Sequence, residues 1–301
     1  MKNYEKKYIK GSCNLLPLNI INVDKLIDKF NIEQLYFKDL KATFSKIQGK
    51  RNSMEDFYYF DIIDDIKILG LFDGHSGSDI SYILPSLFKN LNKCIIKYKN
   101  YNIDINILKE NIYKEYINID KFLLKKNFKK QGSTAILLYI FNDKIITINL
   151  GDSNTMFLNH LMQNKFESIQ HRPNNIIEYN RIINSKCNVT NNNGIYRINN
   201  ELSVSRSFGD FKFKFFKNIY DGINSAVSII PDIYIFSILE NYIIIIATDG
   251  FWDYINFDEI TKIILKYNIF EINKISQNLI LQAIKNGSND NISLILMNIN
   301  A

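Results

Sequence analysis

Acidic residues stand beside the most apolar segments of this 301-residue chain, and their placement constrains the fold more than any other feature. Five acidic groups precede or follow such a segment: Glu55-Asp56, Asp73-Gly74, Gly151-Asp152, Asp249-Gly250 and Asp290-Asn291. A carboxylate at the end of a buried strand is costly unless a positive charge neutralises it. The local sequence has too few basic residues to pair all five groups, so we expect them to converge on cations. The alternative is that some of the Asp-Gly pairs form plain turns, which they favour.

The type of ligand selects the metal. The candidate ligands are oxygen donors, and no set of Cys and His residues has a suitable spacing, which disfavours Zn²⁺ and favours Mg²⁺ or Mn²⁺. Two such ions roughly 3.5–4 Å apart, bridged by one aspartate, would lower the pKa of a shared water and clamp an in-line displacement at phosphorus. The acidic groups therefore favour a two-metal site.

Short segments rich in Ile, Phe and Tyr and bounded by Gly, Asp or Asn are typical of strands, and they occur at 42–47, 57–63, 66–72, 134–140, 145–150, 155–158, 242–248 and 292–299. Helical periodicity predicts helices at 78–97, 106–126, 175–184, 257–266 and 272–285. Pro85 should kink or divide the first of these helices. Because the strands come in adjacent pairs, the pattern favours an α+β fold of antiparallel sheets with helices packed outside.

Residues 1–40 are predicted to form an N-terminal extension of unknown role, with a short amphipathic stretch near residues 23–37. No low-complexity linker or repeat divides residues 41–299, which are predicted to form one domain. Lysine supplies most of the positive charge, and only five arginines occur: Arg51, Arg172, Arg181, Arg197 and Arg206. Since arginine offers a rigid fork of donors that suits carboxylate or phosphate, these five residues are candidates for such contacts.

The composition is that of a folded protein, with 46% apolar, 23% charged and 13% aromatic residues. The net charge of +6 is spread along the chain, which disfavours nucleic-acid binding. The first residues lack the apolar core of a signal peptide, Lys2 excludes N-myristoylation, and the longest apolar run is too short to span a bilayer. Cys13, Cys94 and Cys187 fit neither a zinc pattern nor a disulfide framework. We expect a soluble intracellular protein of the cytoplasm, the nucleus or both, without membrane insertion.

Seven segments, in this order, resemble the motifs of the metal-dependent protein phosphatases of type 2C, the PPM family. They are QGKRNSMED at 48–56, LFDGHSG at 71–77, QGSTA at 131–135, NLGDS at 149–153, LSVSRSFGD at 202–210, ATDGFWD at 247–253 and GSNDN at 287–291. The likeness runs from about residue 40 to the C-terminus. Each segment alone is a weak signal, but seven in the family order are a strong one.

The resemblance implies a four-layer αββα sandwich of two antiparallel sheets flanked by helices, with a metal pair in a channel at one end. It implies that Asp73 bridges the two metal ions, that the Gly74 carbonyl binds one of them, and that Asp249 and Asp290 hold the other. The reaction it implies is hydrolysis of phosphoserine and phosphothreonine in proteins. Water activated by the metal ions would attack directly, without a phosphoenzyme.

Further site residues follow from the same resemblance. Glu55 is implied to act on the metal beside Asp73, through water, and Asp56 to orient the ligands near it. Asp152 and Asp253, together with Asp249, match a weaker third metal site in the family, and the sequence leaves open whether a third ion binds.

Two residues are implied to handle the substrate. Arg51 resembles the arginine that binds the phosphoryl oxygens, and its alternative role is a surface arginine that caps a turn. His75 resembles the general acid that protonates the departing alkoxide, whereas a lone histidine is more often structural. Residues 211–230 match the flap beside the active site and are expected to influence which phosphoproteins bind.

Three departures from the family pattern concern the shape of the substrate groove rather than the metal ligands. Ser76 replaces a glycine, Asn154 stands where an arginine is usual, and residues 182–187 lack the usual small residues. All metal-binding acids are present, which argues against a catalytically dead relative that acts as a regulatory module. A two-metal phosphohydrolase acting on small molecules or nucleotides is the third hypothesis. The sequence does not name the substrate protein, and it leaves the oligomeric state open, with a monomer favoured.

Overall fold

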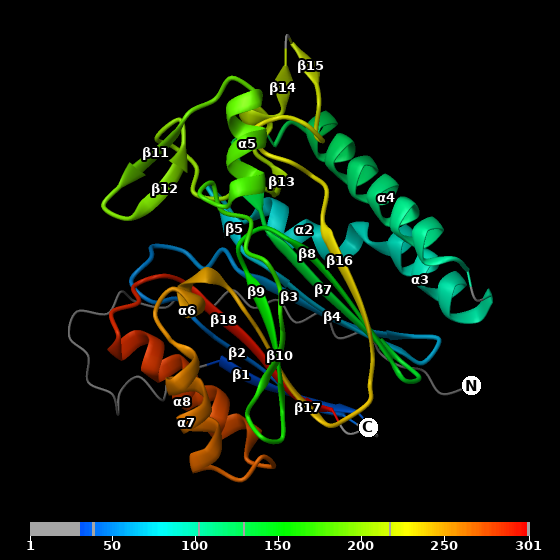
Figure 1. Cartoon of the computed structure of the whole chain (residues 1–301), viewed down its shortest axis with the longest axis vertical. Coiled ribbons are helices and arrows are strands. Elements are labelled where there is room, and N and C mark those ends of the chain that lie inside the picture. The colour runs from blue at the N-terminus through cyan, green and yellow to red at the C-terminus, as the bar shows by residue number, and fades with distance from the viewer. Residues whose placement is uncertain (1–30, 38–39, 102, 129, 217, 300–301) are drawn as a thin grey trace.

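Two antiparallel sheets face each other in the computed structural model, which describes residues 31–37, 40–101, 103–128, 130–216 and 218–299 (Figure 1). The six-stranded sheet has the order β1 (Asn31–Phe37), β2 (Leu40–Ile47), β18 (Ile292–Ile299), β17 (Tyr242–Ala247), β9 (Asn154–Asn159) and β10 (Asn164–Glu167). The five-stranded sheet has the order β16 (Asp232–Ser237), β8 (Lys144–Leu150), β7 (Ala135–Phe141), β4 (Ile66–Phe72) and β3 (Phe57–Ile63).

The central strands are buried on both faces, which explains why their sequences are continuously apolar. Successive side chains of a strand point to opposite faces of its sheet. In β17, Ile244 and Ile246 pack in the core between the two sheets, whereas Ile243 and Ile245 pack against the helices outside. The residues of β4, β7 and β18 divide in the same way.

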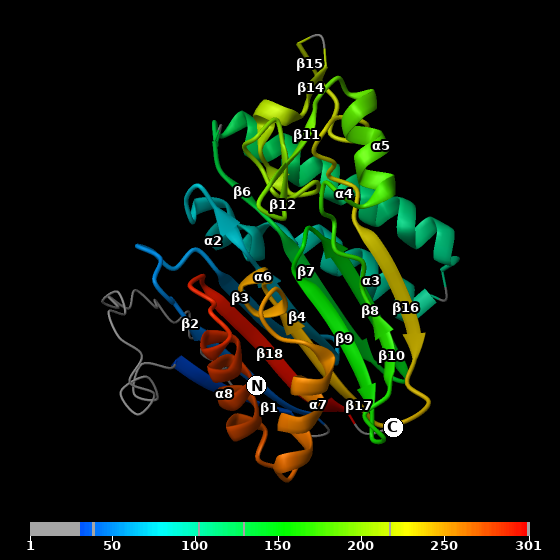
Figure 2. The same cartoon turned by 60° about the vertical axis from the view of Figure 1, so that its left-hand side comes forward.

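Helices cover the outer face of each sheet and complete a sandwich of four layers (Figures 1 and 2). The five-stranded sheet carries α2 (Asp79–Leu87), α3 (Lys89–Tyr101) and α4 (Ile105–Lys125), and the six-stranded sheet carries α7 (Phe257–Lys266) and α8 (Ile272–Lys285). The single helix expected at residues 78–97 is divided into α2 and α3 at Phe88, three residues after Pro85. This agrees with the prediction that Pro85 would kink or divide it.

A smaller region lies at one end of the sandwich (Figures 1 and 2). It contains α5 (Ile176–Asn184), the hairpin of β11 (Val189–Asn192) and β12 (Ile195–Ile198), the short helix Phe211–Phe213, and the hairpin of β14 (Phe215–Phe216) and β15 (Ile219–Tyr220). Its own core includes Ile182, Ile198 and Val227. A three-stranded sheet of β5 (Gly74–His75), β6 (Gly132–Ser133) and β13 (Phe208–Gly209) joins this region to the sandwich.

The expected α+β sandwich is confirmed, and each of the predicted strands and helices has a counterpart. The prediction missed β16 and the short hairpins. It also missed β1, which pairs with β2 although its residues fall in the segment expected to form an N-terminal extension. Residues 1–30 lie outside the described part of the chain, so the proposed boundary at residue 40 stays a prediction.

Candidate metal centre

Strand register places two of the predicted acids side by side in the five-stranded sheet. β3 pairs with β4 from Phe57 opposite Phe72, so Asp56 and Asp73 occupy the next positions beyond that pair. On its other side, Asp73 exchanges two hydrogen bonds with Thr134: its N–H donates to Oγ1 at 3.1 Å, and its carbonyl accepts from the Thr134 N–H at 2.9 Å. Antiparallel pairing thus fixes the position of Asp73 from both neighbours.

The six-stranded sheet brings two other predicted acids, Asp249 and Asp290, close together. Beyond the last pair of β17 and β18, the Thr248 N–H donates to the Ser293 carbonyl at 3.1 Å. The helix α6 (Asp249–Trp252) begins at this point. Gly250 packs so closely that a Cβ on it would lie 3.1 Å from the Cβ of Asp290. The end of β17 and the start of β18 therefore bring Asp249 and Asp290 together.

Hydrogen bonds join these two pairs of strand ends across the sandwich. The Glu55 N–H donates to the side-chain carbonyl of Asn291 at 2.8 Å, and the Gly74 N–H donates to the Glu55 carbonyl at 3.2 Å. The Glu55 carboxylate accepts from the Ser53 hydroxyl at 2.9 Å and from the Gly77 N–H at 3.1 Å. Glu55 therefore lies at the junction of the two sheets, held by its backbone and by its side chain.

Acidic side chains repel one another at this junction. We call them the acidic cluster, which comprises Asp56, Asp73, Asp152, Asp249, Asp253 and Asp290. Burial, reinforced by the charges of neighbouring members, raises the pKa of Asp73 and of Asp249 well above the usual range. Burial is also the main reason why the pKa of Asp56 rises to about 7. A concentration of negative charge of this kind is what bound divalent cations would neutralise.

Two arginines contact the acidic cluster. Arg51 Nη2 lies 2.6 Å from Asp290 Oδ2. Arg172 Nη2 lies 2.5 Å from Asp253 Oδ1, and its Nε lies 3.7 Å from Asp152 Oδ2. Within the described ranges, no three His, Cys, Asp or Glu side chains are arranged as a ready-made metal site. The structure gathers the predicted ligands, but the arginines hold three of their carboxylates in ion pairs rather than in a closed coordination set.

The predicted general acid also has an acidic partner. His75 Nε2 lies 2.7 Å from Asp210 Oδ2, and the Ser207 hydroxyl donates to the same oxygen at 2.5 Å. Burial lowers the pKa of His75, but the charge and hydrogen bond of Asp210, helped by the charges of Asp152 and Glu55, outweigh burial and raise it. The sequence motifs contain Asp210 but gave no signal that it pairs with His75.

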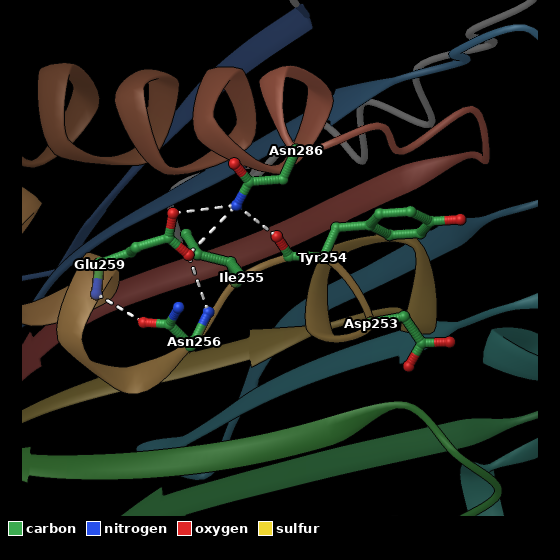
Figure 3. Close-up of a pocket in the computed structure, with 6 residues that line it drawn as sticks. All are labelled: Asp253, Tyr254, Ile255, Asn256, Glu259 and Asn286. Carbon is green, nitrogen blue, oxygen red and sulfur yellow. Dashed lines mark hydrogen bonds between the residues drawn. The ribbon is translucent and has the colours of Figure 1, made fainter. Parts of the chain in front are cut away.

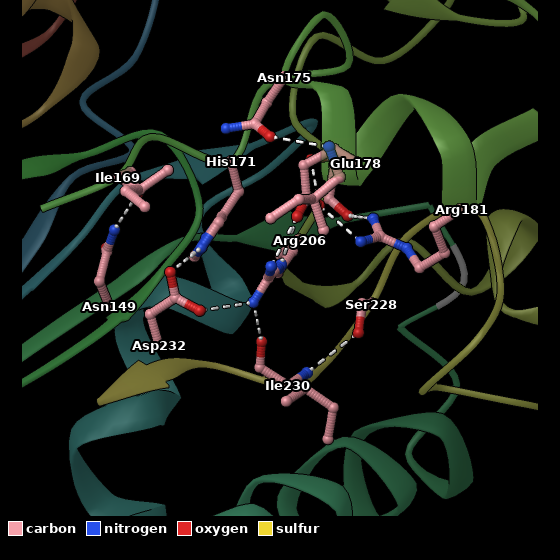
Figure 4. Close-up of polar contacts among 12 residues, drawn as sticks. Asn149, Ile169, His171, Asn175, Glu178, Arg181, Arg206, Ser228, Ile230 and Asp232 are labelled. Carbon is pink, nitrogen blue, oxygen red and sulfur yellow. Dashed lines mark hydrogen bonds and ion pairs between the residues drawn. The ribbon is translucent and has the colours of Figure 1, made fainter. Parts of the chain in front are cut away.

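A polar network missed by the sequence analysis supports the turn after β8 (Figure 4). His171 is fully buried and accepts the Gly151 N–H at Nδ1 at 2.9 Å, so its proton resides on Nε2, which lies 3.1 Å from Asp232 Oδ2. Arg206 bridges Asp232, at 3.0 Å, and Glu178, at 2.6 Å. The sequence pointed to Arg206 through the scarcity of arginine and through the motif at 202–210, but it gave no signal for its partners Glu178 and Asp232.

A pocket of ≈ 360 Å³ lies beside α6, lined by Asp253, Tyr254, Ile255, Asn256, Glu259 and Asn286 (Figure 3). Glu259 accepts from the Asn256 N–H at 3.1 Å and from the Asn286 side chain at 3.0 Å, so much of the lining is already paired internally. Of the six lining residues only Asp253 belongs to the acidic cluster. The pocket therefore adjoins the cluster without containing it.

Two antiparallel sheets face each other between flanking helices, and carboxylates gather at one end beside an arginine and a histidine. These features place the chain in the class of layered α+β proteins with a candidate metal centre. The family model for protein phosphatase 2C matches residues 40–292. The chain therefore belongs to the protein phosphatase 2C family. No helix in the described residues is long and apolar enough to cross a membrane.

Relatives agree with this assignment. "Probable protein phosphatase 2C 71" of Arabidopsis thaliana is 31% identical over 259 residues, which cover 83% of this chain and 53% of that protein, so the chain spans about half its length. "Probable protein phosphatase 2C 17" of the same plant is 30% identical over 269 residues, covering 86% and 88%. The solved structure of a phosphatase from a pathogenic strain of Toxoplasma gondii has a TM-score of 0.76 at 19% identity, covering 90% of this chain and 96% of that one. At that identity the likeness shows the fold alone.

Proposed function

We propose that this chain hydrolyses phosphoserine and phosphothreonine esters of proteins by direct attack of water activated by two divalent cations, without a phosphoenzyme. The observation that carries the proposal is the acidic cluster, to which both sheets contribute and in which burial and then mutual repulsion raise the pKa of Asp73 and Asp249. Such a cluster calls for cations, and a pair of hard cations suits displacement at phosphorus.

The donor set fits Mg²⁺ or Mn²⁺ because it consists of carboxylate and carbonyl oxygens. In this proposal Asp73 bridges two ions, the Gly74 carbonyl binds one of them, and Asp249 and Asp290 hold the other. Glu55 is proposed to act through a water, and its carbonyl accepts from the Gly74 N–H at 3.2 Å, which keeps it beside the proposed ligands. When bound, such ions polarise phosphoryl oxygens and lower the pKa of their water.

Asp152 and Asp253 would bind a third, weaker metal ion only if Arg172 released them. Asp152 and Asp253 are the proposed ligands, and Arg172 contacts both. A cation entering there would have to displace a guanidinium group that is already ion-paired. Asp56 is proposed to orient the ligands rather than to bind metal, since it is buried and accepts from the Thr248 hydroxyl at 3.3 Å.

Arg51 and His75 are the proposed substrate-handling residues. The Arg51 side chain is 63% exposed and reaches the cluster through Asp290, so its remaining donors are open to an incoming phosphoryl group. His75 is proposed to donate a proton to the departing alkoxide, since its contact with Asp210 favours the protonated imidazolium.

The substrates are proposed to be phosphoproteins of the cytoplasm or nucleus. Residues 211–230, which include the hairpin of β14 and β15, lie beside the turn that carries Asp210 and are proposed to influence which phosphoproteins bind. Neither nucleic acid nor membrane is proposed as a partner, and a monomer is the proposed form.

The purified chain should dephosphorylate phosphoserine and phosphothreonine peptides in Mn²⁺ or Mg²⁺ and stop when EDTA removes the metal. Asp73→Asn should lower kcat by at least about a hundredfold, because bridging needs both charged oxygens of that carboxylate. Asp258→Asn, at an exposed aspartate in the first turn of α7, is the matched control and should leave the rate unchanged.

Other outcomes would favour the remaining hypotheses. If no metal-dependent turnover of phosphopeptides occurs although the chain is folded, a regulatory module without activity is favoured. If nucleotides or small phosphate esters are strongly preferred over phosphopeptides, the chain is a different kind of phosphohydrolase. Wild-type activity in Asp73→Asn would contradict the bridging role.

A further inference from the structure

Asp120 is a charged residue in the apolar stripe of α4. Helical spacing places it on the face that also buries Ile112, Tyr116 and Leu123, and its side chain has no exposed surface. A buried carboxylate is costly unless it is paired and fully hydrogen-bonded, so a residue at this position needs partners.

Three groups supply those partners, and all come from one short stretch of chain. Lys214 Nζ donates to Asp120 Oδ2 at 2.8 Å, the Tyr220 hydroxyl donates to the same oxygen at 2.7 Å, and the Gly209 N–H donates to Oδ1 at 2.9 Å. Lys214 is also completely buried. The ion pair therefore joins α4 to the segment that precedes the hairpin of β14 and β15, and the Tyr220 hydrogen bond joins α4 to the hairpin itself.

The ion pair holds the turn Ser207–Asp210 at two backbone atoms. Asp120 accepts from the Gly209 N–H, and Lys214 Nζ donates to the Ser207 carbonyl at 2.7 Å. Such support suits the turn because Asp210 has φ +49°, a left-handed conformation that is unfavourable for a residue with a side chain, whereas Gly209 adopts its φ of +77° without strain.

The same turn carries the groups that hold His75. Asp210 Oδ2 contacts His75 Nε2 at 2.7 Å and accepts from the Ser207 hydroxyl at 2.5 Å, while the Asp210 N–H donates to the Gln131 carbonyl at 2.9 Å. A continuous series of hydrogen bonds thus runs from α4 to His75. Apolar residues in place of a buried ion pair often stabilise a fold equally well, so stability alone does not account for it.

We propose that Asp120 and Lys214 are positioning residues for His75: by clamping the turn Ser207–Asp210 they fix Asp210, which fixes the imidazole that donates a proton to the leaving group. The inference rests on the proposed function for the role of His75. It extends that function to two buried residues, Asp120 and Lys214, that lie outside the seven motifs. Only the turn that they hold, Ser207–Asp210, belongs to one of those motifs.

The test compares leaving groups. Protonation by His75 matters for an alkoxide, which leaves poorly, and matters little for p-nitrophenolate, which leaves without a proton. Lys214→Met, and the neutral double variant Asp120→Asn/Lys214→Met, should lower kcat for a phosphothreonine peptide roughly tenfold more than kcat for p-nitrophenyl phosphate. The double variant removes both buried charges together, so the chain can fold even where the single variant fails.

Two further variants serve as the positive and the negative control for the ratio of the two rates. His75→Asn should show the same selectivity for the leaving group in stronger form. Ile112→Ala removes core packing from the same face of α4 without touching the turn, and it should lower stability while leaving the ratio of the two rates unchanged. A positioning role is contradicted if the ratio stays at the wild-type value in the double variant, or if Ile112→Ala changes it to the same extent.

A second readout does not depend on turnover. Imidazole ¹⁵N signals of His75, recorded at one pH, should show a single hydrogen-bonded ring in the wild type and an averaged ring in the double variant. Absence of phosphatase activity in the wild type would refute the proposed function, whereas an unchanged His75 signal in the double variant would refute the positioning role. The two failures are therefore distinguishable.

Discussion

Each of the five arginines contacts a carboxylate or a backbone carbonyl, although lysine supplies most of the positive charge of the chain. Arg51 and Arg172 contact the acidic cluster, and Arg181 and Arg206 share Glu178. A planar fork of donors can contact two oxygens at once, which a lysine ammonium cannot match in geometry. The scarcity of arginine was therefore informative at the scale of single residues.

Arg51 should contribute mainly to binding of the phosphoryl group. Arg51→Ala removes both charge and fork and should raise KM for a phosphopeptide about tenfold or more, whereas Arg51→Lys, which keeps the charge, should lie between it and the wild type. Steady-state kinetics in Mn²⁺ would measure this. Lys50→Ala, at the exposed neighbouring position, is the control, and a wild-type KM in Arg51→Ala would exclude the proposed role.

Arg172 should compete with a third cation. Arg172→Gln leaves Asp152 and Asp253 without their guanidinium partner, so a third Mn²⁺ should bind about tenfold more tightly than in the wild type. Arg172→Lys keeps a cation there and should stay close to the wild type. Counting bound Mn²⁺ by electron paramagnetic resonance during a titration measures this, and equal affinity in all three proteins would refute the competition.

At the scale of elements, the central strands were predictable because each is a short apolar run that ends at a Gly, Asp or Asn. β16 was missed, although it holds Asp232, because it is an edge strand whose existence depends on pairing with β8 rather than on its own pattern. The hairpin of β14 and β15 was missed because strands of two residues are too short to show a periodic pattern. Asp120 gave a readable signal, an acid within an apolar helical stripe, but its partner Lys214 has no sequence signature.

The ion pair between Glu178 of α5 and Arg206 should make the free energy of unfolding depend on pH in the acid range. Burial raises the pKa of Glu178, but hydrogen bonds and charges from Arg206 and Arg181 outweigh it and lower the pKa from 4.5 to about 2. Since the folded-state pKa is depressed, the stabilisation is complete above pH 4.5 and is lost as the pH falls toward 2.

Glu178→Gln removes this dependence. Between pH 5 and pH 2 the free energy of unfolding of the wild type should fall about 3 kcal/mol further than that of the variant, from the shift in the Glu178 pKa. Urea unfolding at a series of pH values measures both curves. Parallel curves would mean that the arginines do not stabilise the Glu178 carboxylate as described.

At the scale of the whole molecule, the location of the candidate site was predictable because strand ends are fixed by strand order. Asp73 and Asp249 belong to different sheets, and the stacking of these sheets is what brings their charges together. The arginine partners of the carboxylates and the contact between His75 and Asp210 were not predictable, since they depend on loops folded against the end of the sandwich. The sequence therefore located the acidic cluster but did not define its detailed contacts.

Thermal unfolding of the wild type and of Asp73→Asn, with and without Mn²⁺, tests most directly whether the fold gathers these carboxylates for cations. Saturating Mn²⁺ should raise the Tm of the wild type by roughly 5 °C. Asp73→Asn should raise the metal-free Tm, because it relieves repulsion within the acidic cluster, and should abolish most of the increase caused by Mn²⁺. A wild-type Tm that does not respond to Mn²⁺ or Mg²⁺, together with a metal-free Tm lowered by Asp73→Asn, would contradict the account.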